Sequence, residues 1–342
     1  METIIVTPAP NRATMRDVAA LAGVSIQTVS RVLNNSGPAS EATRRQVEDA
    51  AAMLKYEVNL AARSLASKRS KTTGLLVTGE IRHGVARLFS ALEAELASRD
   101  RHIVIATSPT DDPDSLRRAI SYLQGTNPDG MVVLARTSDV LPVIAAKAQV
   151  PCAVIIAGRH ETNRVSTVSI DQYDGAIAAS QYLFDTGCTS PVYLTGDLRW
   201  QDAQVRLNGF RTVCTVNDTE PDWLIGDSWS SASGYAMGQQ LLSRGLPDAI
   251  VAGNDDIAIG AMHALYKAGV KVPDDVSVVG FDDIPQAKFQ NPSLTTVRQD
   301  FTALGRTALE ELDRIIAGET RRHRQLPAEL IVRKSTRPLS DT

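Results

Sequence analysis

The stretch TMRDVAALAGVSIQTVSRVLN, residues 14 to 34, decides how the first part of this 342-residue chain folds. Its apolar residues follow helical spacing on both sides of Gly23, which predicts two short helices joined by a turn. Ser25 can cap the second helix, whose Val29 and Val32 then face inward. A helix-turn-helix of this kind places its second helix in the major groove of duplex DNA, whereas the plainer alternative is a helical hairpin inside a core.

The outer face of the second helix carries side chains that suit base reading. Gln can form two hydrogen bonds with adenine, Arg can bond guanine O6 and N7, and Ile can touch a thymine methyl group. Each good bidentate pair gives roughly 1–3 kcal/mol of discrimination. The residues left on this face are Ile26, Gln27, Ser30, Arg31 and Asn34.

Two further helical patterns follow. SEATRRQVEDAAAML, residues 40 to 54, begins with Ser40 as an N-cap and carries an apolar stripe, so three helices can close a small core. NLAARSLASKRSK, residues 59 to 71, places Leu65 and several alanines on one side of a short helix with basic residues around it. A helix of this length is marginal alone in water.

The runs at 17 to 34, 39 to 56 and 59 to 70 resemble the headpiece and hinge of the lactose-repressor (LacI) family of bacterial transcription regulators, and the resemblance covers nearly the whole chain. It implies that double-stranded operator DNA is the partner and that Leu65 wedges into the minor groove at the operator centre. The DNA-binding residues expected on these grounds are Thr14, Ser25, Ile26, Gln27, Thr28, Ser30, Arg31, Asn34, Asn59, Ala62 and Leu65.

The charge of the chain is divided unequally. Residues 1 to 71 contain ten Lys and Arg against six Asp and Glu, a net charge of +4, and the rest contains 26 against 33, a net charge of −7. The basic segment suits phosphate contacts, and the acidic remainder discourages indiscriminate binding to DNA. The N-terminal end is therefore the DNA-binding end.

Other bulk features place the chain in the cytoplasm. Cys152, Cys188 and Cys214 are odd in number and far apart, which indicates reduced core thiols rather than a disulfide framework. The start of the chain is unlike a signal peptide, and no apolar run approaches a membrane span, so no membrane association is expected.

From residue 72, short apolar runs alternate with amphipathic stretches. Continuous apolar runs suit parallel strands covered on both faces, so the chain predicts βαβ alternation in two series. Strands are expected at 74–79, 102–107, 130–135, 152–158, 167–170, 191–196, 223–227, 249–255, 276–283, 294–300 and 328–334. Helices are expected at 85–99, 114–124, 172–186, 202–215, 232–243 and 257–268.

The predicted fold is an all-α helix-turn-helix headpiece followed by an α/β core of two doubly wound parallel-sheet lobes. Such lobes enclose a cleft with ligand groups at the carboxyl ends of strands. The resemblance agrees, since it implies a core like that of periplasmic binding proteins. The expected divisions are a flexible tail (1–12), a headpiece (13–58), a hinge (59–70), and a core (71–342) with lobe 1 at about 71–168 and 300–327 and lobe 2 at about 169–299 and 328–342.

Polar residues at the predicted strand ends suit a sugar. Carboxylate and amide oxygens accept bonds from vicinal hydroxyls, guanidinium donates to them, and an indole packs on the apolar face of a pyranose. Aligned with the family pattern, the expected effector-binding residues are Arg206, Trp229, Asn254, Asp282, Gln299 and Phe301, with Phe89 for the far end of the effector. The effector is expected to be a mono- or disaccharide.

Duller roles stay open for these residues. Asn254 or Asp255 can simply cap the following helix, Asp282 and Asp283 can be turn residues, Trp229 can be core, and Arg206 can be a solvated helix residue. In the first lobe, EIRHGVARLF departs from the sequence common in relatives, and it offers His83, Arg87 and Phe89. Residues 157 to 159 occupy the place where some sugar-binding relatives have an acid, which leaves the ligand open.

The rival class is an enzyme. The chain has no GxSxG elbow, P-loop, GxGxxG or HExxH motif, and its five histidines lack metal-ligand spacing, so we expect no catalysis, no cofactor and no metal. The function expected is a sugar-responsive repressor of carbohydrate-utilisation genes, released from a pseudo-palindromic operator. The alternatives are a soluble sugar-binding or sugar-metabolising protein, and a regulator that uses a non-sugar effector or a co-repressor.

The family mechanism implies two copies acting together. The chain ends in VRKSTRPLSDT without heptads, so a homodimer is expected rather than a tetramer. Two hinge segments would become helical only when paired over the minor groove, and an effector between the lobes would favour the state in which they are unformed.

Overall fold

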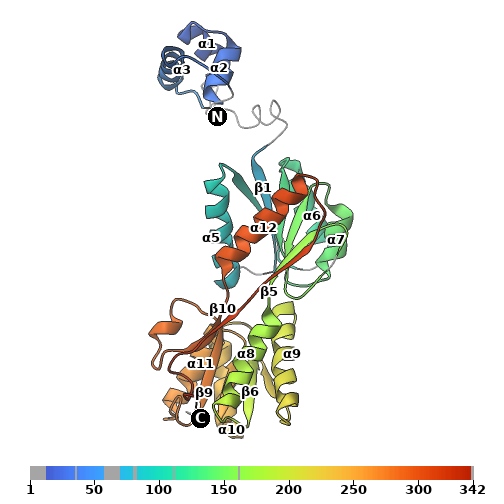
Figure 1. The fold of residues 1–342 in the computed structure, drawn as a ribbon, viewed down its shortest axis with the longest axis vertical. Helices are drawn as coiled ribbons and strands as arrows, with labels where there is room; N and C mark the ends of the chain where they lie inside the picture. The colour runs from blue at the N-terminus through green and yellow to red at the C-terminus, as the bar shows by residue number, and fades with distance from the viewer. Residues whose placement is uncertain are drawn as a thin grey trace, which may run out of the picture. The chain divides into compact units, whose positions relative to one another are not determined.

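The computed structural model describes residues 13–34, 37–57, 70–79, 83–110, 112–160 and 162–339, with the backbone alone at His83. The chain divides into two compact units, residues 1–70 and 71–342, and each is described by itself (Figure 1).

Over its described residues, the N-terminal unit is a bundle of three helices, α1 (Met15–Ala22), α2 (Ile26–Leu33) and α3 (Glu41–Met53). Gly23 ends α1 with a φ of 64°, a left-handed conformation that glycine adopts without a Cβ clash. Val18, Val29 and Val47, one from each helix, are completely buried in a common core. The predicted helix-turn-helix is confirmed. The short α1 presents mainly Val18 and Ala19 to the core, and its Leu21 is 49% exposed.

The first lobe of the larger unit is a sheet with the strand order β2-β1-β3-β4-β5-β11, and all its neighbouring strands are parallel. Helices α5 and α12 cover one face of the sheet, and α6 and α7 cover the other. Its strands are β1 (Thr72–Thr78), β2 (His102–Ser108), β3 (Gly130–Leu134), β4 (Cys152–Ile155), β5 (Ser166–Ile170) and β11 (His323–Leu326). Its helices are α5 (His83–Ser98), α6 (Pro113–Gly125), α7 (Val140–Lys147) and α12 (Phe301–Ile316).

The second lobe repeats the plan with the order β7-β6-β8-β9-β10-β12, in which only β12 is antiparallel to its neighbour among the strands that the structure describes. Helices α10 and α11 cover one face, and α8 and α9 cover the other. Its strands are β6 (Pro191–Thr195), β7 (Asp222–Ile225), β8 (Ala249–Ala252), β9 (Ser277–Asp282), β10 (Thr295–Arg298) and β12 (Glu329–Ile331). Its helices are α8 (Gln172–Asp185), α9 (Gln201–Val216), α10 (Ser231–Arg244), α11 (Asp255–Lys267) and the short 3₁₀ turn η1 (Ala287–Phe289).

The chain passes between the two sheets after β5, after β10 and after β11. These passages place the carboxyl ends of the central strands of both sheets around a common space. The predicted architecture of two doubly wound parallel-sheet lobes is thereby confirmed. Strand β11 was not predicted, nor were helices α7 and α12.

The three cysteines are unpaired and buried, as predicted. Burial raises the pKa of the Cys152 thiol to about 12, so this thiol is inert at neutral pH. None of the helices that the structure describes is long and apolar enough to cross a membrane.

Candidate functional site

Helix α2 presents the predicted base-reading residues on its outer side. Ser25 is its N-cap, and the Ser25 hydroxyl accepts a bond from the Thr28 backbone N–H at 3.1 Å and lies 2.9 Å from the Thr28 hydroxyl. Ile26 is 44% exposed and Gln27 is exposed, so both side chains at the start of the helix are available to a groove. An exposed apolar side chain such as Ile26 is typical of a surface that a binding partner covers.

Arg31 and Asn34 end the outer face of α2. A Cβ atom placed on Gly37 would lie 2.9 Å from Cδ and 3.1 Å from Cγ of Arg31, so the aliphatic stem of Arg31 runs directly over this glycine. The Asn34 amide donates to the Ser30 hydroxyl at 3.2 Å. The absence of a side chain at Gly37 therefore provides the space that the Arg31 side chain occupies.

Thr14 is placed by a capping box at the start of α1. Its backbone N–H donates to the Asp17 carboxylate at 2.8 Å and its hydroxyl donates to the same oxygen at 2.7 Å, which fixes the entry of the helix. These bonds hold the pKa of Asp17 below its ordinary value. The predicted hinge residues Asn59, Ala62 and Leu65 lie outside the described residues.

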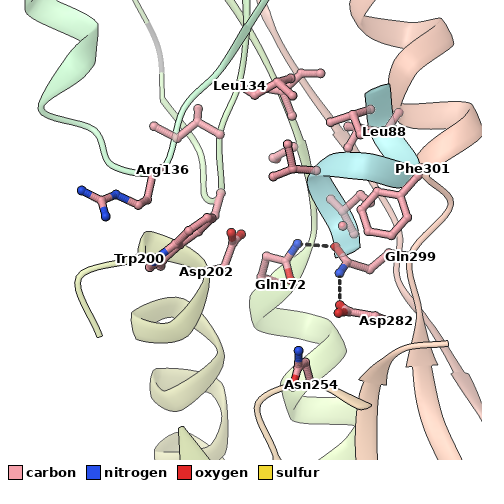
Figure 2. A pocket seen from close by; sticks show the side chains of 18 of the residues that line it. Leu88, Leu134, Arg136, Gln172, Trp200, Asp202, Asn254, Asp282, Gln299 and Phe301 are labelled. Atoms are coloured by element: carbon pink, nitrogen blue, oxygen red, sulfur yellow. Dashed lines mark hydrogen bonds between the residues drawn. The ribbon is translucent and has the colours of Figure 1, made fainter. Parts of the chain in front are cut away.

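In the larger unit, a cavity of about 300 Å³ lies between the two lobes, lined by both (Figure 2). The first lobe contributes apolar walls, including Leu88 and Leu134, and the second lobe contributes most of the polar groups. Six of the seven predicted effector-binding residues line it, namely Arg206, Trp229, Asn254, Asp282, Gln299 and Phe301.

Four polar side chains on one side of the cavity form a closed ring. The Arg206 Nε donates to the Gln172 side-chain oxygen at 2.8 Å. Gln172 Nε2 donates to Gln299 Oε1 at 2.7 Å, and Gln299 Nε2 donates to Asp282 Oδ1 at 2.5 Å (Figure 2). Arg206 Nη2 lies 3.6 Å from the same Asp282 oxygen, which completes the ring, and Nη1 donates to the Gly253 carbonyl at 2.5 Å. Because Gln172 and Gln299 stand where the chain passes between the sheets, the ring joins the second lobe to two of the passages.

Asp282 is held in an unusual state. Its φ of 109° is a backbone conformation that residues with a side chain rarely adopt. Burial raises the pKa of its carboxyl to about 6, against the opposing effects of Arg206 and of the Gln299 bond, while Asp202 and Asp256 raise it further. Its bonds all use Oδ1, so within the part of the chain that the structure describes Oδ2 is left to accept from a ligand.

Asn254 and Trp229 combine a structural role with a place in the cavity wall. Asn254 is the N-cap of α11, since its Oδ1 accepts from the Ile257 N–H at 2.9 Å, and its Nδ2 donates to the Trp229 carbonyl at 3.1 Å. Trp229 is 8% exposed and its indole ring packs flat on Gly196, where any Cβ would collide with it. The cap and core roles considered for these residues are therefore real, and both residues still line the cavity.

Of the two aromatic residues predicted to contact the effector, Phe301 lies in the cavity wall and Phe89 does not. Phe301 lines the cavity with its ring against Gly84 of α5. Phe89 does not line it and packs against the hydrophobic core of the first lobe. The helical period explains the difference, because Val85 and Leu88 turn their side chains toward the cavity and Phe89 lies about 100° further around the helix.

The neighbouring first-lobe candidates do not add contacts. Arg87 is exposed to solvent on α5 and is not part of the cavity wall. The side chain of His83 lies outside the described residues. Of residues 157 to 159, only Ala157 lines the cavity.

Several cavity residues were not predicted. Gln172 and Ser169 lie at the first passage between the lobes, and Trp200 and Asp202 lie at the start of α9. Arg136, two residues beyond β3, places its guanidinium 5.8 Å from the Trp200 ring. The rule that ligand groups follow the ends of parallel strands points to Arg136, whereas nothing in the local pattern distinguishes Gln172 from an ordinary first residue of a helix.

No group of three or more His, Cys, Asp or Glu side chains among the described residues is arranged to hold a metal ion. The residues that line the cavity offer hydrogen-bonding, charged and aromatic groups.

Comparison with known proteins gives the family. Residues 14–59 match the family model described as bacterial regulatory proteins, lacI family, and residues 180–336 match that of the periplasmic binding protein-like domain. The chain is 31% identical to the lactose operon repressor of Escherichia coli (strain K12) over 327 residues, 94% of this chain and 90% of that protein. It is 30% identical to the HTH-type transcriptional repressor PurR of Histophilus somni (strain 129Pt), over 96% of this chain and 100% of that protein.

Solved structures agree. The lac repressor dimer bound to operator and the anti-inducer ONPF matches with a TM-score of 0.87 and 30% identity, covering 96% of this chain and 100% of that one. The complex of the transcriptional regulator CelR with cellobiose matches with a TM-score of 0.70 and 31% identity, covering 95% of this chain and 100% of that one. These relatives are repressors and regulators rather than enzymes, and the chain belongs to the LacI family of DNA-binding transcriptional repressors.

Proposed function

We propose that this repressor controls carbohydrate-utilisation genes and is released from a pseudo-palindromic operator by a mono- or disaccharide bound between its lobes. The observation that carries the proposal is the closed ring of Arg206, Gln172, Gln299 and Asp282 beside aromatic walls. It offers a free carboxylate oxygen for vicinal hydroxyls, while Trp229 and Phe301 offer apolar faces for a pyranose.

Size and relatives support the same ligand class. A cavity of about 300 Å³ is at the small end of the range for small-molecule sites, which favours a sugar over a large cofactor. The related regulator CelR was solved with cellobiose. The chain is about as similar to the PurR repressors as to the lactose operon repressor, so sequence identity alone does not select the ligand class.

The mechanism we propose couples the cavity to DNA through residues 59–70. Two chains associate through their cores, each α2 enters a major groove, and the paired hinges fold over the minor groove with Leu65 between base steps. Unstacking at such a step costs a few kcal/mol and is offset by contacts made on bent DNA. A sugar that binds more tightly to the lobe arrangement of the DNA-free repressor favours release from the operator. It can shift this equilibrium by no more than its difference in affinity between the DNA-free and DNA-bound states.

The test begins with operator selection from a random duplex library and a thermal-shift screen of the full chain against mono- and disaccharides. We expect one palindromic consensus, and at least one sugar that both raises Tm and lowers operator affinity. Asp282→Ala should keep operator affinity within about twofold and lose the response to that sugar.

The outcomes separate the parts of the proposal. Failure to select any preferred palindrome would contradict an operator-binding role. A response only to non-sugar compounds would replace the sugar by another effector, and a response that survives Asp282→Ala would move the binding site away from this cavity.

A further inference from the structure

The cavity contains more acid than base. Its walls include the carboxylates of Asp202, Asp256 and Asp282 and the guanidiniums of Arg136 and Arg206. Both guanidiniums are already occupied by protein groups. Arg206, 4% exposed, takes part in the ring and lies 3.8 Å over the Phe281 ring, and Arg136 stacks on Trp200.

Asp202 is the acid in this set without a protein partner. It stands in the first turn of α9, and its carboxylate points into the open space between Trp200 and Gln172 (Figure 2). No hydrogen bond or ion pair joins it to another residue that the structure describes, and its strongest electrostatic neighbour is Arg206, one turn along the helix. Burial raises the pKa of this carboxyl above its ordinary value, although the residue as a whole is only half-buried.

A second group points to an unfilled hydrogen-bonding need in the same wall. The hydroxyl of Ser169, a residue only 1% exposed, has no partner among the described residues. Buried polar groups in folded proteins are nearly always bonded to protein, water or ligand, so this hydroxyl marks the cavity as a place where a polar molecule is accommodated.

We propose that Asp202 determines which effectors this repressor accepts: it selects a sugar that presents a hydroxyl or ammonium donor to the carboxylate and rejects phosphorylated or otherwise anionic sugars. The inference rests on the sugar effector proposed above and narrows it. A donor would supply the partner that the desolvated carboxylate lacks. An anion would place like charges together in a cavity of low dielectric, where both guanidiniums are already engaged.

Three matched sets of probes test the inference on the full chain by thermal shift and calorimetry. The neutral set is glucose, galactose and cellobiose, the anionic set is their 6-phosphates, and the cationic set is glucosamine, galactosamine and the β-1,4-linked glucosamine disaccharide. We expect binding in the neutral or cationic set and at least tenfold weaker binding of the corresponding phosphate. Tighter binding of the amino sugar than of its parent assigns an ammonium to Asp202, and equal or weaker binding assigns a hydroxyl.

Asp202→Asn keeps the shape of the side chain and removes its charge. We expect this variant to bind the best neutral or amino sugar about tenfold more weakly, as loss of a charged hydrogen bond does. The difference in affinity between that sugar and its phosphate should become smaller. Asp197→Asn is the matched control, because Asp197 lies on the preceding loop, pairs with Arg199 at 2.7 Å and does not line the cavity. It should leave both affinities unchanged.

The result that overturns the inference differs from the one that overturns the proposed function. A phosphate ester that binds as tightly as its parent sugar, or a sugar affinity and phosphate discrimination unaltered in Asp202→Asn, refutes the role of Asp202 while a sugar effector stands. If no probe of any set binds, the sugar effector and the inference fail together.

Discussion

Among single residues, Asp282 shows how the cavity obtains a reactive hydrogen-bond acceptor. Its carboxyl has a pKa of about 6 in the folded protein against 3.8 ordinarily. Between these two pH values the carboxyl is more protonated in the folded state than in the unfolded chain. Ionising Asp282 therefore lowers the free energy of unfolding. The full loss is present above pH 6 and disappears as the pH falls toward 3.8. The same burial leaves a carboxylate acceptor in the wall of the cavity.

Asp282→Asn converts that cost into a measurable difference. Two pKa units correspond to roughly 3 kcal/mol, which for a domain of this size is several degrees in Tm. We therefore expect the Tm of the variant, relative to wild type, to be several degrees more favourable at pH 8 than at pH 4, where little of the cost remains. Differential scanning calorimetry at both pH values checks this, and a difference in Tm that does not change with pH would contradict the assigned pKa.

At the scale of an element, α2 depends on a residue outside it. The φ of Gly37 lies outside the left-handed region that strains residues with a side chain, yet a Cβ there would meet the stem of Arg31 at 2.9 Å. The position of the Arg31 side chain on α2 therefore depends on a glycine in the loop that follows the helix.

Gly37→Ala should displace Arg31 without unfolding the headpiece. We expect operator affinity to fall by three- to tenfold, about 1 kcal/mol, because a bidentate base contact is worth 1–3 kcal/mol and the side chain can partly readjust. Fluorescence anisotropy with the selected operator measures it. Gly125→Ala, where a Cβ meets nothing within 4 Å, is the control and should bind like wild type; equal affinity of the two variants would show that Gly37 does not position Arg31.

The same scale shows how far the sequence predicts the structure. The strands that are apolar throughout, such as β3 with five buried residues, are recognisable because both faces are covered. Strand β11, HRQL, is a partly exposed edge strand without an apolar run, so its sequence carries no strand signal. Its place comes from pairing with β5, a partner more than 150 residues earlier in the chain.

The site divides in the same way. Asp282 is the last residue of β9 and Asn254 follows β8, so a rule about strand ends locates both, and Gln299 was placed by family resemblance. Gln172 was missed because its role exists only through Gln299, 127 residues away, and Arg206, 34 residues away. Phe89 lies outside the cavity wall because one position along a helix changes the face that a side chain occupies.

For the whole molecule, the division of charge has a direct consequence for binding. The segment 1–71 carries +4 and the remainder −7, so attraction to phosphates is concentrated at one end. A neutral sugar in the cavity meets no such long-range field. The two activities of the chain should therefore respond differently to salt.

We expect operator affinity to fall by 10³ to 10⁵ between 50 and 200 mM salt if a dimer neutralises six to ten phosphates, because each neutralised phosphate releases counterions. Affinity for the sugar identified in the screen should change less than twofold over the same range. Parallel anisotropy and calorimetry titrations give both slopes. Operator binding that is insensitive to salt would mean that the basic segment does not contact the phosphate backbone.

The last two strands of the chain, β11 and β12, also determine when the two-lobed core can be completed during synthesis. Each completes the edge of a different sheet, so a ribosome that has made three hundred residues has produced two unfinished lobes with unpaired edges at β5 and β10. The buried core of the helical headpiece, by contrast, lies wholly within residues 15–56. A newly made chain thus contains every core residue of its helical headpiece well before the two lobes that enclose the cavity can be completed.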